Sequence, residues 1–222
     1  EEGKGIPVIG PELVTVRGSD GLPEPLGQAL ARRLSATLCL PTSELPARPD
    51  LNDVVALHLR RGGERDSLYA RLQQWLREMP PESAPALAAL ARIAGFQLYV
   101  TLTFDGVLAN ALTLARTGAA VRTVAYSTNA VRDLPADVDE LKAPVVFHLL
   151  GRATSTPDYA ICDDDLLEFL HALQDGPRRP VKLFDALRSR HLLLLGCGFS
   201  DWLARFFLRT VRGVELSQRR KR

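Results

Sequence analysis

From residue 96 onward, short apolar runs alternate with longer stretches that have helical spacing. The runs consist mainly of valine, leucine and other apolar residues, which is typical of strands covered on both faces. Strands that alternate with helices predict a parallel sheet with right-handed crossovers. The predicted strands are residues 6–9, 96–101, 121–126, 145–149 and a last buried strand at 192–195; helices are predicted at 25–38, 104–115, 163–173, 181–187 and 202–211, and a short extended run at 159–162.

Residues 41–95 carry helical spacing only, interrupted by Pro80-Pro81 and Gly95. We therefore predict an α/β fold: a Rossmann-like parallel sheet flanked by helices, with a small all-helical inserted lobe. The α/β unit comprises residues 1–40 and 96–212, and the lobe comprises residues 41–95. Residues 213–222 are basic at their end, and we expect them to be a linker to a further effector or sensor domain in the same chain.

Charge and cysteine usage narrow the class of partner. The formal net charge is +2, with 28 Lys and Arg against 26 Asp and Glu, which is too even for a nucleic-acid groove or an anionic membrane surface. No apolar run approaches the length of a membrane span. Cys39, Cys162 and Cys197 lie far apart without a CxxC pair, which indicates a reducing, cytoplasmic compartment and no metal site.

Glycines and small hydroxyl residues follow several of the predicted strands, where ligands of open parallel sheets bind. Glycine lets a phosphate or ribose approach the backbone, and the following helix offers N–H groups. Two alternatives remain open: the glycines could form tight turns, and Asp105 or Ser200 could cap a helix. The candidate ligand-binding residues are Gly10, Thr101, Thr103, Asp105, Gly151, Gly196, Gly198 and Ser200.

Four blocks in this order resemble the SIR2-like family of bacterial anti-phage defence proteins, which are relatives of the sirtuins and bind or cleave NAD. They are TLTFD at 101–105, FHLLG at 147–151, the acidic helix DDDLLEFL at 163–170, and GCGFSDW at 196–202, the most specific of the four. The resemblance spans residues 96–209 and implies NAD as ligand or substrate, with no metal because the sirtuin zinc ribbon is absent. The expected Gly-Ala-Gly near the N-terminus reads Gly10-Pro11-Glu12.

Two departures from the family pattern bear on catalysis. Members that hydrolyse NAD rely on an asparagine and on a histidine directly before glycine, and these positions read Thr103 and Leu150 here. Leucine cannot act as a general base. His148 lies two residues earlier, on the same side of the strand if the strand continues regularly. Thr103 and His148 are the candidate catalytic residues, with a structural histidine as the alternative for the second.

The resemblance leaves three functions open. The first is a SIR2-like domain of a multidomain immune protein, which binds NAD or a related nucleotide, or assembles the attached effector, with catalysis weakened or lost. The second is an active NAD hydrolase that depletes NAD on infection. The third is a structural homo-oligomerisation module, in which Trp202, Phe206 and Phe207 would be contact residues rather than packing the last helix on the sheet.

Overall fold

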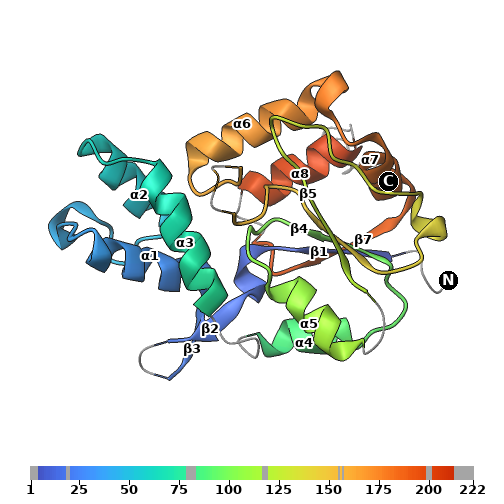
Figure 1. The fold of residues 1–222 in the computed structure, drawn as a ribbon, viewed down its shortest axis with the longest axis horizontal. Coiled ribbons are helices and arrows are strands. Elements are labelled where there is room, and N and C mark those ends of the chain that lie inside the picture. The colour runs from blue at the N-terminus through green and yellow to red at the C-terminus, as the bar shows by residue number, and fades with distance from the viewer. Residues whose placement is uncertain are drawn as a thin grey trace, which may run out of the picture.

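The computed structural model describes residues 5–18, 21–78, 84–116, 120–154, 156, 158–198 and 202–212. Five parallel strands form one sheet in the order β5-β6-β4-β1-β7 (Figure 1). The predicted parallel α/β sheet is therefore confirmed, and each predicted strand is present. The strands are β1 (Gly5–Ile9), β4 (Leu98–Thr101), β5 (Arg122–Ala125), β6 (Val145–His148) and β7 (His191–Leu195).

Helices cover both faces of the sheet (Figure 1). One layer contains α6 (Asp163–Gln174), α7 (Val181–Ser189) and α8 (Trp202–Arg212), and the other contains α4 (Pro85–Ala91) and α5 (Val107–Ala115). Side chains alternate between the two layers along each strand. On β4, Val100 packs with α6 and α7, whereas Tyr99 packs with α4 and α5. This double coverage explains why the inner strands are apolar throughout.

A helical lobe lies beside the sheet (Figure 1). It contains α1 (Leu26–Thr37), α2 (Leu51–Arg60) and α3 (Asp66–Glu78), and α1 packs on α2. The helices α2, α3 and α4 follow one another in sequence, in agreement with an inserted helical region, although α4 packs on α5 rather than in the lobe. A short antiparallel hairpin, β2 (Thr15–Arg17) with β3 (Pro23–Pro25), precedes α1.

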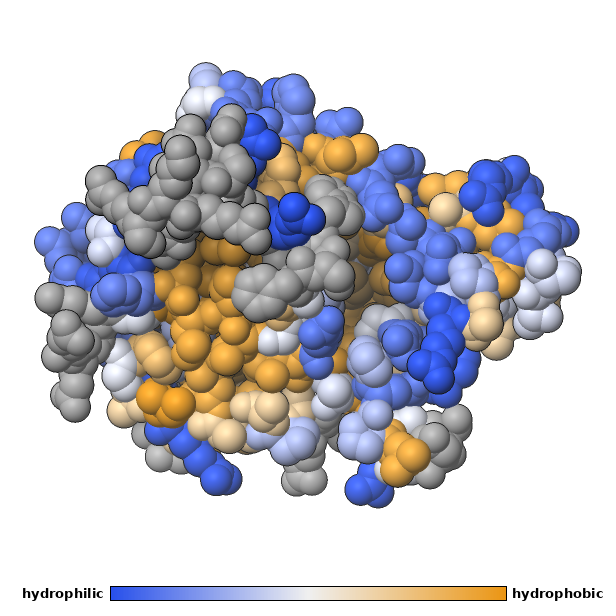
Figure 2. All heavy atoms as spheres, turned by 180° about the vertical axis from the view of Figure 1, so that it is seen from behind, coloured by the Kyte–Doolittle hydropathy of each residue, from blue (hydrophilic) through white to orange (hydrophobic). Residues whose placement is uncertain are grey.

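One sequence-based expectation needs correction. The strand β7 is an edge strand and is not buried, since 43% of Leu193 is exposed. Figure 2 shows an apolar area on the back of the molecule, the side on which β7 forms the edge of the sheet. The extended run at 159–162 stays outside the sheet and makes an isolated bridge from Tyr159 to Gly151. The helix α6 begins at Asp163, with Cys162 as its N-cap.

The last helix packs inward. Phe207 and Val211 are buried in the core cluster that includes α7, and Phe206 packs against it. These contacts agree with the packing alternative for Phe206 and Phe207, while the side chain of Trp202 lies outside the described residues. None of the three cysteines forms a disulfide. Among the helices described, none is both long and apolar enough to cross a membrane.

Candidate functional site

The carboxyl ends of four strands meet at one edge of the sheet. Ile9 is paired with both Thr101 and Leu195, and Thr101 is paired with His148. Because the strands are parallel and in register, the loops that follow them leave side by side. Backbone bonds continue this alignment one residue further: Leu102 N–H donates to Ile9 O at 2.9 Å, and Gly10 N–H donates to Leu195 O at 2.8 Å.

A cavity of about 470 Å³ lies between these loops and the helical lobe; we call it the sheet-edge cavity. Its volume is in the range of small-molecule sites. Thr103 and Leu150, which the sequence resemblance aligns with the expected asparagine and histidine, line this same cavity. Most of its wall is apolar. The cavity is lined by Pro11, Val14, Leu26, Gly27, Leu30, Asp50, Leu51, Asn52, residues 102–105, Leu150, residues 160–163 and Leu166.

Three helices begin at this cavity. The first residues of α1, α2 and α6 all contribute to its wall. Helix N-termini carry partial positive charge and unpaired N–H groups, so their convergence favours an anionic ligand group. The partial positive charge at the start of α2 is already balanced by the acidic Asp50–Asp53 capping box. At the start of α6 it is balanced by the three aspartates of the first turn. The first turn of α1 has no acidic residue and no side-chain cap.

The start of α1 is open toward the cavity at Gly27. A Cβ added there would meet nothing within 4 Å. Leu26 N–H donates to Val14 O, but the part of the chain that the structure describes offers no partner to the Gly27 N–H. Sequence reasoning did not identify this residue. The signal for it is Gly27 as the second residue of a helix whose first turn has no acidic side chain.

Three of the candidate glycines lie against backbone atoms of neighbouring loops. A Cβ on Gly10 would lie 2.3 Å from Gly196 O, and one on Gly196, with φ of 63°, would lie 2.4 Å from Leu13 N. Gly151 has φ of 79°, and its Cβ would lie 2.2 Å from Asp158 O. These three glycines therefore allow tight contacts between loops. Gly198 lines neither cavity described here, and Ser200 lies outside the described residues.

Thr101, Thr103 and Asp105 follow one another at the end of β4. The hydroxyl oxygens of the two threonines are 2.9 Å apart, and Thr103 is close enough to Asp105 to favour its ionised form. Val107 N–H donates to Asp105 Oδ1 at 2.9 Å, at the start of α5. Burial raises the pKa of the Asp105 carboxyl, against the effect of these donors. Asp105 thus contacts the first residue of its helix and also lines the cavity.

His148 is fully buried and lines neither cavity. Because β6 ends at His148, the strand does not continue regularly to Leu150, which packs with Phe147 on the other face. His148 Nδ1 lies 3.1 Å from Thr103 O, so Nδ1 carries the proton and the carbonyl accepts it. Burial and the nearby charge of Arg152 lower the pKa of His148 to about 4, although the bond to Thr103 opposes this.

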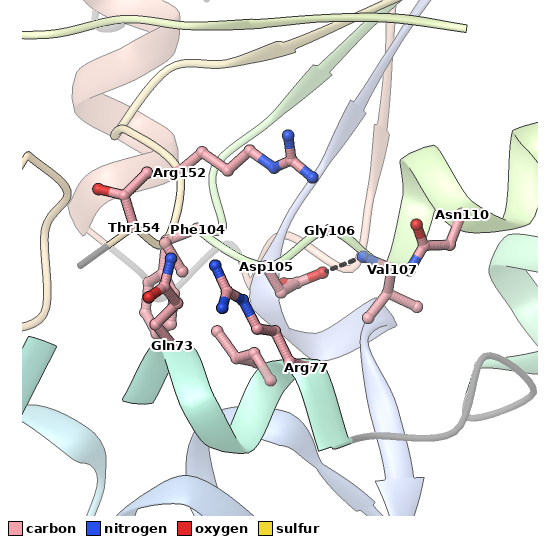
Figure 3. A pocket seen from close by; sticks show the side chains of 11 residues that line it. Gln73, Arg77, Phe104, Asp105, Gly106, Val107, Asn110, Arg152 and Thr154 are labelled. Atoms are coloured by element: carbon pink, nitrogen blue, oxygen red, sulfur yellow. Dashed lines mark hydrogen bonds between the residues drawn. The ribbon is translucent and has the colours of Figure 1, made fainter. Parts of the chain in front are cut away.

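A second cavity, of about 500 Å³, lies on the other side of Phe104 and Asp105, which line both cavities. We call it the arginine cavity, because Arg77 of α3 and Arg152 of the loop after β6 line it (Figure 3). Sequence reasoning singled out neither arginine. The full lining is Gln73, Leu76, Arg77, residues 104–107, Asn110 and residues 152–154.

An ionic network holds α6 against the lobe. Arg65 Nη1 donates to Asp165 Oδ1 at 2.5 Å, and Tyr69 donates to Oδ2 at 3.2 Å. The backbone N–H groups of Ile161 and Cys162 donate to the same Oδ2. Burial and the neighbouring carboxylate raise the pKa of Tyr69. Since residues 160–163 line the sheet-edge cavity, this network fixes one of its walls.

Within the described part of the chain, no group of three or more His, Cys, Asp and Glu side chains could hold a metal ion.

Comparison with known proteins supports the resemblance seen in the sequence. No individual curated protein matches the chain significantly. The SIR2-like domain family matches residues 97–221, more than half of the chain. This range includes four of the five strands of the sheet and the loops that carry Thr103, Leu150 and Gly196. The chain therefore belongs to the SIR2-like domain family.

Proposed function

We propose that this SIR2-like domain binds NAD or a related nucleotide in the sheet-edge cavity and hydrolyses it weakly or not at all. The observation that carries the proposal is the joint position of Thr103 and Leu150 on the wall of one cavity into which three helix N-termini open. In a multidomain immune protein, such a domain would report the nucleotide to an attached effector or assemble that effector.

The residues present fit a nucleotide. Leu102, Leu150 and Leu166 offer apolar surface to a planar base or a nicotinamide ring. The Thr103 hydroxyl lies 2.9 Å from the Thr101 hydroxyl and lines the cavity, and a hydroxyl can both donate to and accept from a ribose hydroxyl. NAD, when bound, would supply the N-glycosidic bond on which hydrolases of the family act.

The diphosphate requires N–H donors, because the described residues that line this cavity include no lysine or arginine. The loop at Gly10 is poorly suited: Pro11 has no N–H, and the N–H groups of Gly10 and Glu12 donate to Leu195 O and Gly196 O. The start of α1 fits better, since Gly27 has an open face and an N–H without a partner in the described structure. We therefore assign the anionic group of the nucleotide to the N-terminus of α1.

Weak catalysis follows from the side chains at the two family positions. Leu150 cannot accept a proton, and the Thr103 hydroxyl is already paired with the Thr101 hydroxyl. His148 is buried behind Thr103 and is held by the Thr103 carbonyl. In this proposal His148 and Thr101 position the Thr103 loop, and Thr103 and Asp105 contact the ligand.

Calorimetry with NAD and with ADP-ribose tests the binding. We expect both to bind the unmodified protein, and Gly27→Asp to weaken binding by about 10- to 100-fold, because a carboxylate would face the diphosphate. The same variant should unfold at a higher urea concentration, since aspartate in the first turn of a helix is more favourable than glycine. Loss of binding could then not be attributed to misfolding.

Gly27→Asn is the matched control, because it adds nearly the same volume without the charge. It should bind within about threefold of the unmodified protein if charge is the cause. No measurable heat with either nucleotide would refute the proposal, and equal losses in both variants would refute the place assigned to the diphosphate.

A fluorogenic NAD analogue separates this proposal from the active hydrolase. We expect little or no turnover by the full-length protein, because no general base stands at position 150. Rapid turnover that Thr103→Val abolishes would contradict the expectation and support the hydrolase. Valine has the branched outline of threonine but no hydroxyl, so this substitution tests the hydroxyl itself.

A further inference from the structure

We propose that the arginine cavity is a second ligand site, distinct from the nucleotide cavity, which binds the phosphate group of a small phosphorylated molecule. The two cavities lie back to back and share Phe104 and Asp105 as a common wall. Their remaining walls differ. Among the residues that the structure describes, none of those lining the sheet-edge cavity is basic, whereas two of those lining the arginine cavity are.

Hydrogen-bond donors from three separate elements converge on this cavity. Gln73 and Arg77 are one turn apart on α3 and therefore lie on the same face of that helix. Asn110 comes from the first turns of α5, and Arg152 comes from the loop after β6. In Figure 3, Arg77 and Arg152 approach from opposite sides and extend toward the turn at Asp105 and Gly106.

The donors are available to a ligand. Within the described ranges, neither guanidinium forms an ion pair, and neither the Gln73 nor the Asn110 side chain has a hydrogen-bond partner. Asp105 is the acidic member of the lining, and it is engaged by Thr103 and by Val107 N–H. Two guanidinium groups against one buried carboxylate leave an excess of positive charge.

Position and shape favour a phosphate over a bare carboxylate. Arg152 Nη2 would lie 3.4 Å from a Cβ on Gly106, so this guanidinium lies against the start of α5, where the helix dipole adds to its charge. Two guanidiniums that approach from different sides can each contact different oxygens of a tetrahedral phosphate. The volume of about 500 Å³ leaves room for a sugar-sized group attached to that phosphate.

Ribose 5-phosphate is a suitable probe, with inorganic phosphate as the minimal one. We expect calorimetry to detect binding of ribose 5-phosphate to the unmodified protein and a loss of at least about tenfold in Arg77→Gln and in Arg152→Gln. Arg77→Lys should recover part of the affinity, since lysine keeps the charge but not the planar fork. Both arginines are exposed, so these variants should fold normally, which urea unfolding checks.

Arg71→Gln is the matched control. Arg71 is an exposed arginine on the same helix but outside the cavity, so its loss changes the net charge equally. Equal weakening in Arg71→Gln, no effect of Arg77→Gln and Arg152→Gln, or no binding by the unmodified protein would overturn the proposal.

Gly27→Asp distinguishes this site from the nucleotide cavity. A variant that no longer binds NAD but retains ribose 5-phosphate would establish two separate sites. Loss of both ligands in Gly27→Asp would overturn the second site. If the unmodified protein binds ribose 5-phosphate but not NAD, the second site stands while the proposed nucleotide function fails.

Discussion

Asp165→Asn should lower the free energy of unfolding by about 3 kcal/mol, because it disrupts a buried carboxylate that four partners contact. The side chain of Asp165 is 9% exposed and accepts from Arg65, Tyr69 and two backbone N–H groups. An amide in its place has one oxygen instead of two, and its NH2 group would face donors. Urea unfolding followed by tryptophan fluorescence measures the change.

Asp164→Asn is the control for the loss of charge at the start of α6. The Asp164 side chain is 82% exposed and lies 3.9 Å from Arg65, so its removal should cost less than about 0.5 kcal/mol. Similar losses in the two variants would show that the acidic first turn acts only through the helix dipole. The structure predicts a clear difference, since one carboxylate is buried between α6 and the lobe and its neighbour faces solvent.

Asp165→Asn should also change the shape of the sheet-edge cavity. Asp165 fixes the backbone of Ile161 and Cys162, and both residues line that cavity. Arg65 and Tyr69 connect this point to the lobe, which forms the opposite wall. Asp165→Asn is therefore expected to weaken nucleotide binding as well as stability, whereas Asp164→Asn should not.

The run of three aspartates shows what the sequence leaves undetermined. Asp163, Asp164 and Asp165 are identical in type and adjacent, so their acidic character predicted only a favourable helix start. The partner that distinguishes Asp165 is Arg65, 100 residues away along the chain. Such a pair becomes visible only when the lobe and α6 are placed together in space.

Strand positions were predictable because their signal is local. The strands at 98–101 and 145–148 are covered on both faces. Such strands need apolar side chains at successive positions, so a short stretch of sequence is enough to identify them. The leucine run of β7 has the same appearance, yet β7 is at the edge and Leu193 is partly exposed. The order of strands decides exposure there, and no short segment encodes that order.

The candidate site was predictable to the level of the loops. Parallel strands bring their carboxyl ends together, so the loop of Thr103 and that of Leu150 had to lie near each other. The roles of the glycines were harder to predict, because Gly10 and Gly196 are each required by the backbone of the other's loop. Gly27 and the two arginines of the second cavity lie outside the family blocks, and only the arrangement of the lobe makes them visible.

Acidification should destabilise the protein through His148. In the folded protein burial lowers the pKa of this side chain to about 4, from an ordinary value of 6.5. Between these two values the unfolded chain takes up a proton that the folded protein excludes, so stability falls as the pH falls below 6.5. The full loss is about 3 kcal/mol once the pH is below 4, and about 2 kcal/mol is expected between pH 7.5 and pH 5.

His148→Asn isolates this contribution. Asparagine can still donate to Thr103 O but does not titrate, so its stability should lack the histidine's share of the pH dependence. Burial raises the pKa of Asp105, which acts in the opposite direction at low pH, because the folded protein then binds the proton more readily. Asp105 is present in both proteins, so its effect cancels in the difference between them.

At pH 7.5 the variant should be less stable than the unmodified protein, since it fills the histidine's site incompletely. That gap should narrow by about 2 kcal/mol at pH 5, as the unmodified protein loses stability and His148→Asn does not. His171→Asn on the exposed side of α6 is the control for the same replacement at a surface histidine. A gap of constant size across this range would contradict the prediction, because it would mean that His148 takes up a proton as readily in the folded protein as in the unfolded chain.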